Sequence, residues 1–437
     1  MAPSRASGLA RLLYAAAAQA ARGAARLAPE GESKLLRALR ARRGIRDRYR
    51  AWGERHRDPD RPLLWMHAPS VGEGLQARPV LQLVRERHPD AQLAYTFFSP
   101  SAAAFARTLG ADFADYLPFD TAGDARAALD ALRPTALVFS KLDVWPRLAA
   151  AADRRGVRLG LVSATLAETS SRRRGPAAAL LADAYARLDL VGAIDAGDAD
   201  RLVALGARRD AVSVTGDTRY DQVWARALAA DREGPLLAPL ASDRPTLVAG
   251  STWPADEHVL LPAWDSLARR LPSARLIIAP HEPTPAHLAP IEAWARQAGR
   301  RLARLGAADA AAADVVLVDR LGVLGDLYVL ADAAFVGGGF HRAGLHSVLE
   351  PAAFGAPVLF GPRHTASRDA GLLLAAGAAA AQPDAAGLTE TLAGWLGDRA
   401  EGTAAGARAR SVVQSGLGAA ERSYALVARL LARPTTG

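Results

Sequence analysis

The sequence predicts an α/β protein with two domains, each built on a doubly wound parallel sheet, and with the two domains facing a cleft. Short apolar runs alternate with helical stretches along the chain, which is typical of parallel sheets. One polar, irregular stretch near the middle interrupts this rhythm, which then restarts. The length of 437 residues also suits two domains with separate cores.

The charge distribution and the interrupted rhythm set the expected domain bounds. We expect a basic amphipathic arm at 1–57, an N-terminal domain at 58–225 and a C-terminal domain at 226–437. The polar stretch Thr218–Arg244 is interpreted as the linker. The closing helical pattern, Ala419–Leu431, is expected to pack back across the cleft.

The apolar runs give the expected strands in order. The first is Leu63–His67, followed by a turn at 70–74 and an amphipathic helix from Leu75 to Arg87. The N-terminal domain has further expected strands at Gln92–Phe97, Ala136–Phe139, Arg158–Val162, Leu190–Ala193 and Val212–Thr215. The C-terminal domain has them at Thr246–Gly250, Ala274–Ala279, Val315–Val318, Ala333–Val336 and Val358–Phe360.

The positive charge is concentrated in the arm. Residues 1–57 contain 14 Arg and Lys and four Asp and Glu, a net of +10, so the remainder of this +9 chain is near −1. A nucleic-acid binder would need a basic face on the folded body, and we expect no nucleic-acid partner. The arm suits an anionic membrane surface, but its arginines leave no apolar run of about 20 residues. A helix packed on the first domain is the alternative.

The chain has no cysteine, which excludes disulfides and thiolate metal sites and fits a reducing compartment. The acidic pair Asp198 and Asp200 opens a predicted helix, where capping explains it. His67, His281 and His346 follow separate strands and lack the spacing of a helical zinc pair. We therefore expect no metal site.

A glycine-rich turn in the C-terminal domain is the clearest candidate site. Gly337, Gly338 and Gly339 follow an expected strand and precede a helix predicted to open near His346 and end at Gly355. Backbone amides at a helix start can hold a phosphate, because the helix dipole favours negative charge. The alternative is a tight turn that needs glycine only for its positive φ.

Other polar side chains are expected to complete this nucleotide site. Glu350 lies about one helical turn further on, placed to accept hydrogen bonds from sugar hydroxyls. Ser251, Thr252 and His281 follow two other strands of the same domain. In parallel sheets such loops share the carboxyl edge, where ligands bind.

A second group follows strands of the N-terminal domain. Ser70, Gly72 and Glu73 lie between the first strand and its helix. Glu73 could take a proton from a hydroxyl, or Ser70 and Glu73 could simply cap the helix. Lys141 and Asp143 follow another strand and could lie in the cleft, or they could form a solvated pair.

Six motifs in order resemble the 3-deoxy-D-manno-octulosonic acid (Kdo) transferases of lipopolysaccharide synthesis, glycosyltransferase family 30. The resemblance covers nearly the whole chain. The motifs are Ser70-Val-Gly-Glu73, Asp143-Val-Trp-Pro146, Gly250-Ser-Thr-Trp-Pro254, Ala279-Pro-His-Glu282, Gly337-Gly-Gly339 and His346-Ser-Val-Leu-Glu-Pro351, with Phe360-Gly-Pro362 closing the last.

The resemblance implies a GT-B fold of two Rossmann-like domains and an activity that needs neither metal nor cofactor. It implies CMP-Kdo as donor on the C-terminal domain and a lipid A precursor, lipid IVA, as acceptor on the N-terminal one. Glu73 then resembles the catalytic base, and Lys141 and Asp143 match a cleft position. The positions matching those around the nucleotide are Ser251, His281, Gly338, Ser347 and Glu350.

The implied location is the cytoplasmic face of the inner membrane, with peripheral attachment through the arm. Three features depart from the family pattern: Lys141 stands where a carboxylate is common, Ser347 replaces a frequent Asn, and the arm is unusually polar. The expected reaction is an inverting transfer of Kdo. The alternatives are a GT-B transferase with a UDP-sugar donor and a non-catalytic membrane-surface adaptor.

Overall fold

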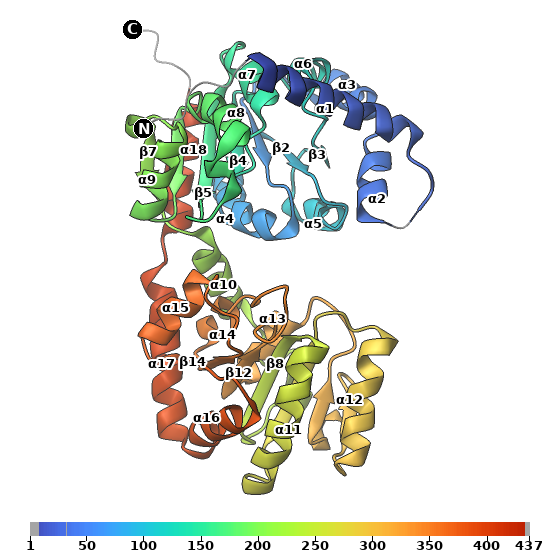
Figure 1. Ribbon diagram of the computed structural model, residues 1–437, viewed down its shortest axis with the longest axis vertical. Coiled ribbons are helices and arrows are strands. Elements are labelled where there is room, and N and C mark those ends of the chain that lie inside the picture. Colours follow the sequence, from blue (N-terminus) through green and yellow to red (C-terminus); the bar gives the residue numbers. More distant parts are fainter. Residues whose placement is uncertain (1–7, 32, 433–437) are drawn as a thin grey trace. The chain divides into compact units, whose positions relative to one another are not determined.

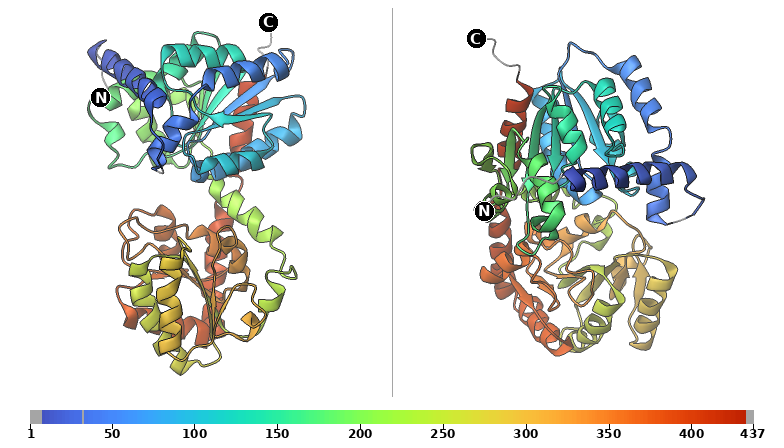
Figure 2. Two further views of the ribbon diagram at one scale, coloured as in Figure 1. Left: turned by 90° about the vertical axis from the view of Figure 1, so that its right-hand side faces the viewer. Right: turned by 45° about the horizontal axis from the view of Figure 1, so that its top comes forward.

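The computed structural model describes residues 8–31 and 33–432, which fall into two compact units (Figure 1). Unit 1 contains the chain up to Gln222 and the segment from Leu417 onward, and unit 2 contains Val223–Gly416. Each unit is a seven-stranded parallel sheet with helices on both faces (Figure 2). The predicted α/β class with two parallel sheets is confirmed.

The sheet of unit 1 has the strand order β3-β2-β1-β4-β5-β6-β7. Its chain order therefore reverses between β1 and β4, which pair directly with Leu64 opposite Ala136. The strands are β1 Leu63–His67, β2 Gln92–Phe97, β3 Phe113–Tyr116, β4 Ala136–Ser140, β5 Arg158–Ala164, β6 Leu190–Ala193 and β7 Val212–Val214.

Side chains alternate between two cores along each central strand, as the pleat requires. On β1, Leu63 and Trp65 enter the core covered by α3 and α6 to α9, whereas Leu64 and Met66 enter the core covered by α4, α5 and α18. The helices are α1 Gly8–Leu27, α2 Lys34–Ala41, α3 Ile45–His56, α4 Val71–Arg87, α5 Ala102–Ala106, α6 Ala122–Leu132, α7 Pro146–Asp153, α8 Gly175–Tyr185, α9 Ala196–Leu205 and α18 Ala419–Leu431. Helix α10, Thr218–Ala229, contains the division between the units.

Unit 2 repeats this plan with the strand order β10-β11-β9-β8-β12-β13-β14. Here β8 and β12 are neighbours, with Gly250 opposite Val336. The strands are β8 Thr246–Thr252, β9 Arg275–Pro280, β10 Leu302–Arg304, β11 Val315–Leu317, β12 Ala333–Val336, β13 Val358–Phe360 and β14 Ala379–Ala381. The helices are α11 Pro254–Arg270, α12 Pro285–Gln297, α13 Leu324–Leu327, α14 Leu349–Phe354, α15 Arg368–Ala375, α16 Ala385–Gly397 and α17 Arg399–Ser415.

Every predicted strand is present, and three short strands at the sheet margins, β3, β10 and β14, were not predicted. The predicted linker is wrong in its first half, because residues Thr218–Ala229 form the helix α10. Two predicted helix starts also differ. Helix α4 begins at Val71, four residues earlier than expected, and α14 begins at Leu349, three residues later.

The closing helix α18 corrects the predicted domain bounds. It was assigned to the C-terminal domain, 226–437, but belongs to unit 1, and the division lies after Gln222. Leu426 and Leu430 of α18 pack in the same core as Met66. Gly160 on β5 permits this approach, because a Cβ there would lie about 2.5 Å from Leu430. The helix therefore covers one face of the first sheet.

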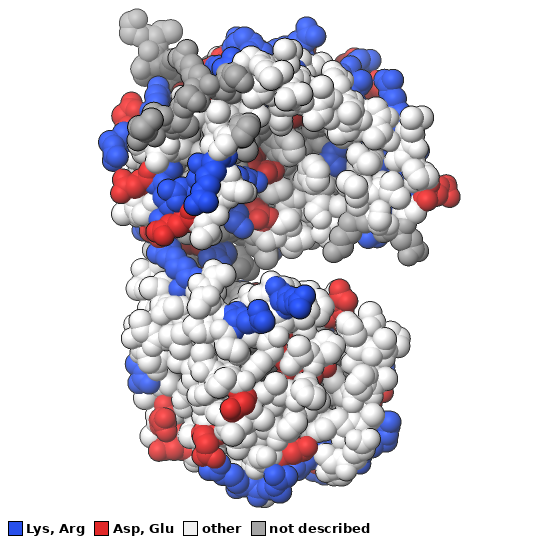
Figure 3. Space-filling view, in the orientation of Figure 1, with Lys and Arg blue, Asp and Glu red and all other residues white. Residues whose placement is uncertain are grey.

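The described part of the arm folds onto unit 1. Tyr49 of α3 is fully buried and meets Phe113 edge-on, with ring centroids 4.7 Å apart. Arg22 and Arg46 both pair with buried Asp124, and Arg48 pairs with Asp115. Acidic and basic side chains are interspersed over the face seen in Figure 3. These three arginines of the arm are thus paired with acids of the domain.

Helix α1 nevertheless keeps an exposed apolar side. Leu9, Leu12 and Leu13 retain 66 %, 69 % and 62 % of their accessible surface. Among the described helices, none combines the length and apolarity that crossing a bilayer requires. The structure therefore shows the alternative from the sequence, a helix packed on the domain. The same helix also has an apolar face that no described residue of unit 1 covers.

Candidate active site

Glu73 and Lys141 meet at the point where the strand order of unit 1 reverses. Glu73 lies in the first turn of α4, directly after β1, and Lys141 follows β4, the strand beside β1. The Lys141 Nζ donates to Glu73 Oε1 at 3.1 Å. Ligands of doubly wound sheets bind at this reversal, outside the carboxyl ends of the strands. The structure therefore brings together two residues predicted separately.

The Glu73 carboxylate is held in its ionised form. The Ser70 hydroxyl donates to Glu73 Oε2, and the Ser140 hydroxyl donates to the Glu73 backbone carbonyl at 3.3 Å. Burial raises the pKa of Glu73, but the Ser70 hydrogen bond and the Lys141 ammonium outweigh it and the net pKa is lowered. The side chain of Glu73 is 17 % exposed and that of Lys141 is 44 % exposed. The pair is thus reachable by a ligand.

Lys141 has a left-handed backbone, with φ 66°. A side chain in this region costs roughly 1 kcal/mol, and such residues concentrate at functional sites. The Lys141 amide donates to the Val162 carbonyl at 2.9 Å, which fixes the strained turn. This turn directs the ammonium group to Glu73.

Asp143 lies apart from that pair and makes no ion pair or hydrogen bond with either residue in the described structure. Its Oδ2 lies 3.1 Å from His67 Nε2 and accepts the Trp145 indole N–H at 3.0 Å. Burial raises the pKa of Asp143, but the contacts with His67 and Trp145 lower it overall. We interpret Asp143 as fixing the loop that presents Lys141.

Gly72 is exposed, and a Cβ there would approach only Ser70 Oγ, at 3.7 Å.

The predicted residues of unit 2 gather at its own reversal point, between β8 and β12. Ser251 has φ 54° and lies where the register between β8 and β9 shifts. The Thr252 hydroxyl is buried and donates to Glu257 Oε1 at 2.8 Å. Thr252 was predicted to bind the nucleotide, but its hydroxyl already donates its hydrogen bond to Glu257.

The role predicted for the glycine amides is wrong at two of the three positions. The Gly337 amide donates to the Gly250 carbonyl at 2.9 Å, and the Gly338 amide donates to Asp256 Oδ2 at 2.7 Å. A Cβ on Gly337 would collide with the Ser251 carbonyl. The alternative, a turn that needs glycine only for a positive φ, applies at Gly338 alone among the three; what the structure supports is a turn that needs glycine for close backbone packing.

Collisions at the next two glycines support the same interpretation. Gly338 has φ 92°, and a Cβ on it would collide with the Gly344 carbonyl. A Cβ on Gly339 would collide with the backbone of Gly361. All three glycines therefore let neighbouring backbone segments approach closely.

Asp256 is a central residue that the sequence analysis missed. It is fully buried and accepts hydrogen bonds from the amides of Trp253 at 2.9 Å, Gly338 at 2.7 Å and Phe340 at 3.0 Å. Its spacing after Trp253 suggests only a helix capping box. Nothing local indicates the link to a glycine turn about 80 residues away.

The amides available to a phosphate lie further along the loop. The His346 amide donates to the Gly337 carbonyl at 3.1 Å. The amides of Ser347, Val348 and Leu349 precede or begin α14 and donate to no group among the described residues. Ser347, a predicted nucleotide residue, is exposed beside them. Three consecutive free amides fit an anionic oxygen.

Glu350 is also free to receive a ligand. Within the described chain its carboxylate has no hydrogen bond or ion pair. Burial raises the pKa of Glu350, opposed by the charge of Arg226 and reinforced by that of Asp326. A half-buried acceptor without a partner matches the predicted role toward sugar hydroxyls.

A stack of rings forms one wall of this site. Trp253 lies 4.6 Å from His281 and 4.4 Å from His341, measured between ring centroids, and His281 lies 4.4 Å from His346. The Trp253 indole N–H donates to His346 Nε2 at 3.1 Å. Burial and neighbouring His281 lower the pKa of His346. Neither Trp253 nor His341 was predicted to belong to the site.

Two parallel-sheet units with polar loops at their reversal points place the protein in the structural class of the GT-B glycosyltransferases and related nucleotide-sugar enzymes. The family described as 3-deoxy-D-manno-octulosonic-acid transferase (kdotransferase) matches residues 40–222. A 3-deoxy-D-manno-octulosonic acid transferase of Bordetella pertussis is 34 % identical over 74 % of this chain and 76 % of its own. The chain belongs to the Kdo transferase family and is a glycosyltransferase.

A transferase of the same name from Haemophilus influenzae is 26 % identical, over 76 % of this chain and 77 % of its own. Among solved structures, a UDP-GlcNAc 2-epimerase from Neisseria meningitidis bound to UDP-GlcNAc has a TM-score of 0.63 at 14 % identity. That match covers 84 % of this chain and 100 % of the epimerase, and supports the fold.

Proposed function

We propose that this protein transfers Kdo from CMP-Kdo to a hydroxyl of a lipid A precursor, with inversion at the anomeric carbon. Membership of the Kdo transferase family supports the reaction. The observation that supports the mechanism is the Glu73–Lys141 pair at the reversal point of unit 1.

On the acceptor side, Glu73 is the base. The acceptor oxygen bonds to the anomeric carbon, the bond from that carbon to the CMP phosphate breaks, and the hydroxyl proton passes to the Glu73 carboxylate. Charge develops as in other glycosyl transfers, with an oxocarbenium-like transition state. Lys141 orients the carboxylate and keeps it ionised before the acceptor binds.

On the donor side, the amides of Ser347, Val348 and Leu349 hold the phosphate of CMP. As the phosphate leaves it gains negative charge, which these N–H groups stabilise. Glu350 accepts hydrogen bonds from the ribose. The rings of Trp253 and His281 provide an apolar wall.

We propose that the enzyme attaches peripherally to the cytoplasmic face of the inner membrane. The exposed leucines of α1, Leu9, Leu12 and Leu13, are spaced three and four residues apart and therefore lie on one side of the helix. Such a face, with arginines on the same helix, suits an interfacial position on an anionic bilayer.

A product assay tests the proposed reaction. CMP-Kdo made in situ and a tetra-acylated lipid A precursor are incubated with the protein, and the masses of the products are measured by mass spectrometry. We expect the acceptor mass to rise by a whole number of Kdo units with matching CMP release. Binding of both substrates without CMP release would instead indicate a non-catalytic adaptor.

Nucleotide protection tests the donor separately. We expect CMP and CTP to raise the melting temperature, because the binding of a ligand to the native state alone stabilises it. Stabilisation by UDP and not by CMP would contradict the donor assignment and favour a UDP-sugar transferase.

A further inference from the structure

The helix that carries Glu73 is held by hydroxyl groups from two other elements. The Ser140 hydroxyl at the end of β4 donates to the Glu73 backbone carbonyl at 3.3 Å. The Thr218 hydroxyl donates to the Gln76 backbone carbonyl, in the second turn of α4, at 2.6 Å. The Gln76 side-chain amide also donates to Asp217 Oδ1 at 3.2 Å. The first two turns of α4 are therefore tied to the end of β4 and to the residues where α10 begins.

Ser163 adds a third hydroxyl to this arrangement. The hydroxyl oxygens of Ser163 and Thr218 lie 2.9 Å apart. A hydroxyl has one hydrogen to donate, and that of Thr218 goes to the Gln76 carbonyl, so Ser163 is the donor to Thr218. Ser163 and Thr218 are fully buried and Gln76 is 5 % exposed. In such surroundings consecutive hydrogen bonds strengthen one another, and this chain runs from Ser163 through Thr218 to α4.

The backbone at Ser163 is strained. Among the described residues of unit 1, those other than glycine with a positive φ are Arg133, Lys141 and Ser163. Arg133 caps the C-terminus of α6, where a left-handed residue is common. Ser163 instead has φ 50° inside β5, where the register with β6 shifts. Irregularities of this kind re-aim side chains next to active sites, and this one directs the Ser163 hydroxyl to Thr218.

The two strained residues Lys141 and Ser163 support the same site. The Lys141 amide donates to the carbonyl of Val162, the neighbour of Ser163, at 2.9 Å. Lys141 presents its ammonium group to Glu73, and Ser163 supports the hydroxyl that holds α4. Strain of this kind persists only where the surrounding structure enforces it, and it clusters at functional sites. The strain therefore points to a role in placing the Glu73 carboxylate.

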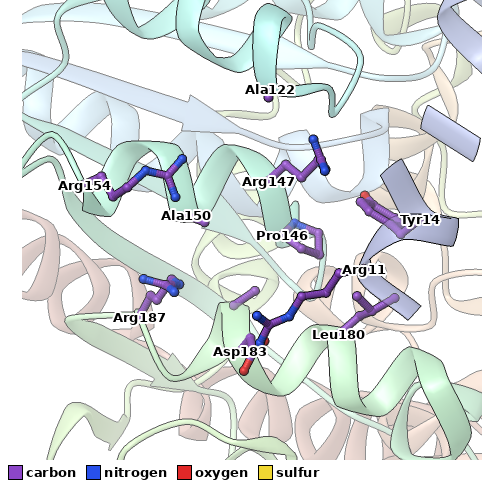
Figure 4. Close-up of a pocket in the computed structure, with 11 residues that line it drawn as sticks. Arg11, Tyr14, Ala122, Pro146, Arg147, Ala150, Arg154, Leu180, Asp183 and Arg187 are labelled. Carbon is purple, nitrogen blue, oxygen red and sulfur yellow. The ribbon is translucent and has the colours of Figure 1, made fainter. Parts of the chain in front are cut away.

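The loop of Lys141 is anchored separately, at the start of α7. Asp120 accepts the Arg147 amide at 3.0 Å and the Tyr14 hydroxyl at 2.7 Å. Figure 4 shows Tyr14 and Arg147 at this end of α7. None of these contacts involves α4. The position of Glu73 relative to Lys141 therefore depends on how α4 itself is held.

We infer that Thr218, oriented by Ser163, is a positioning residue for Glu73. It fixes α4 so that the carboxylate meets both Lys141 and the acceptor hydroxyl. The inference rests on the proposed role of Glu73 as the base. Thr218 is fully buried and therefore acts through α4, not on a substrate. Because a displacement of about 1 Å can slow a reaction about 100-fold, loss of this tie lowers turnover more than nucleotide binding.

The test compares Thr218 variants with a matched control in the full-length protein. Thr218→Val removes the hydroxyl and keeps a similar shape, whereas Thr218→Ser keeps the hydroxyl. The control is Thr246→Val in unit 2. The buried Thr246 hydroxyl likewise donates to a backbone carbonyl, that of Arg244, at 2.9 Å, and accepts from a buried donor, Arg275 Nη2, at 3.1 Å. The measurements are kcat for transfer to the lipid A precursor and the melting temperature with and without CMP.

We expect Thr218→Val to lower kcat by about ten-fold or more, while CMP still raises the melting temperature as in wild type. Thr218→Ser should recover most of the lost turnover. Thr246→Val should also lower the melting temperature, because it leaves a buried donor without its acceptor, but should keep kcat. Equal losses of kcat in Thr218→Val and Thr246→Val would overturn the inference, because they would show only a general effect of lowered stability.

Two further variants keep the inference falsifiable. Ser163→Ala removes the donor to Thr218 but leaves the bond from Thr218 to Gln76, so we expect a smaller loss of kcat, about two-fold to five-fold. An unchanged kcat in Ser163→Ala would contradict the hydroxyl chain even if Thr218→Val does not fold. Glu73→Gln in the same assay reports on the base itself. Near-normal turnover there would refute the proposed base, and with it this inference. A normal kcat of Thr218→Val beside an inactive Glu73→Gln would overturn the positioning role alone.

Discussion

At the scale of single residues, Lys141 is the most informative position. The chain has 54 Lys and Arg, and only Lys34 and Lys141 among them are lysines. Lys141 also adopts a left-handed backbone and pairs with Glu73. The pairing has a physical consequence, because it places a cation beside the carboxylate that we propose as the base.

This pairing predicts a change in pH dependence. Glu73 acts as a base only when ionised, so activity falls as the pH drops through its pKa. Lys141→Met removes a cause of the lowered pKa and leaves burial, which raises it. We expect the acidic limb of the kcat/KM profile to move to higher pH.

Lys141→Arg, which keeps the cation, should move that limb less. The measurement is kcat/KM for transfer across the acidic pH range for the three proteins. A limb in the Lys141→Met variant that stays in place or moves to lower pH would contradict the assigned role of Lys141.

At the scale of elements, the strands and the glycine turn were predictable, but the chemistry of that turn was not. Apolar runs bounded by turns identify strands from local sequence alone. The three glycines are equally consistent with a phosphate site and with close packing. Asp256 decides between these two roles, because its carboxylate accepts the hydrogen bond of the Gly338 amide. Asp256 lies 82 residues away in the sequence, so this contact cannot be predicted locally.

Two helix bounds were missed for different reasons. Helix α10 has the apolar spacing of a helix at Tyr220, Val223 and Trp224, and interpreting the whole stretch as a linker overlooked it. Helix α14 starts late because the His346 amide donates to the Gly337 carbonyl instead. The start of α14 therefore depends on a contact outside the local sequence, whereas α10 could have been predicted from it.

A pair of glycine substitutions tests the packing role of the turn. Gly338→Ala forces a Cβ onto a backbone with φ 92° and against the Gly344 carbonyl. We expect a loss of roughly 1–3 kcal/mol and weaker thermal protection by CMP. In the control, Gly371→Ala on α15, a Cβ meets nothing within 4 Å and its helix should gain stability.

Urea unfolding of both variants provides the comparison, and the CMP-dependent rise in melting temperature provides the second reading. A Gly338→Ala protein as stable as the Gly371→Ala control would show that the turn tolerates a side chain. The packing explanation of the three glycines would then be withdrawn.

At the scale of the whole molecule, the arm is not a detachable anchor. Tyr49 of α3 is completely buried in the first core, and Arg46 of the same helix pairs with Asp124. Removing residues 1–57 would therefore damage the fold as well as any membrane contact. A deletion cannot separate these effects, but substitutions on the exposed face of α1 can.

Leu9→Glu with Leu12→Glu places carboxylates on that face without touching the core. We expect flotation with anionic vesicles to fall by about ten-fold or more and the melting temperature to stay the same, because both side chains are mostly exposed. The control is Leu228→Glu with Leu321→Glu, which alters leucines that are 66 % and 74 % exposed elsewhere. Equal losses in both would exclude α1 as the membrane-contacting element.

The pairing of Glu73 with Lys141 also belongs to this scale. Each residue was identified from its place after a strand, but their meeting depends on β1 lying beside β4. Strand order is set by the packing of the whole sheet and cannot be derived from the spacing of 68 residues between them. The site could therefore be predicted as residues, but not as a geometry.

Glu73→Gln tests the central claim most directly, because it keeps the size of the side chain and removes the base. Transfer to the lipid A precursor is measured at saturating CMP-Kdo, with Glu86→Gln on the exposed side of α4 as control. We predict that Glu73→Gln lowers kcat by at least about 100-fold while CMP affinity stays within a few-fold. Near-normal turnover in Glu73→Gln would show that another group takes the proton.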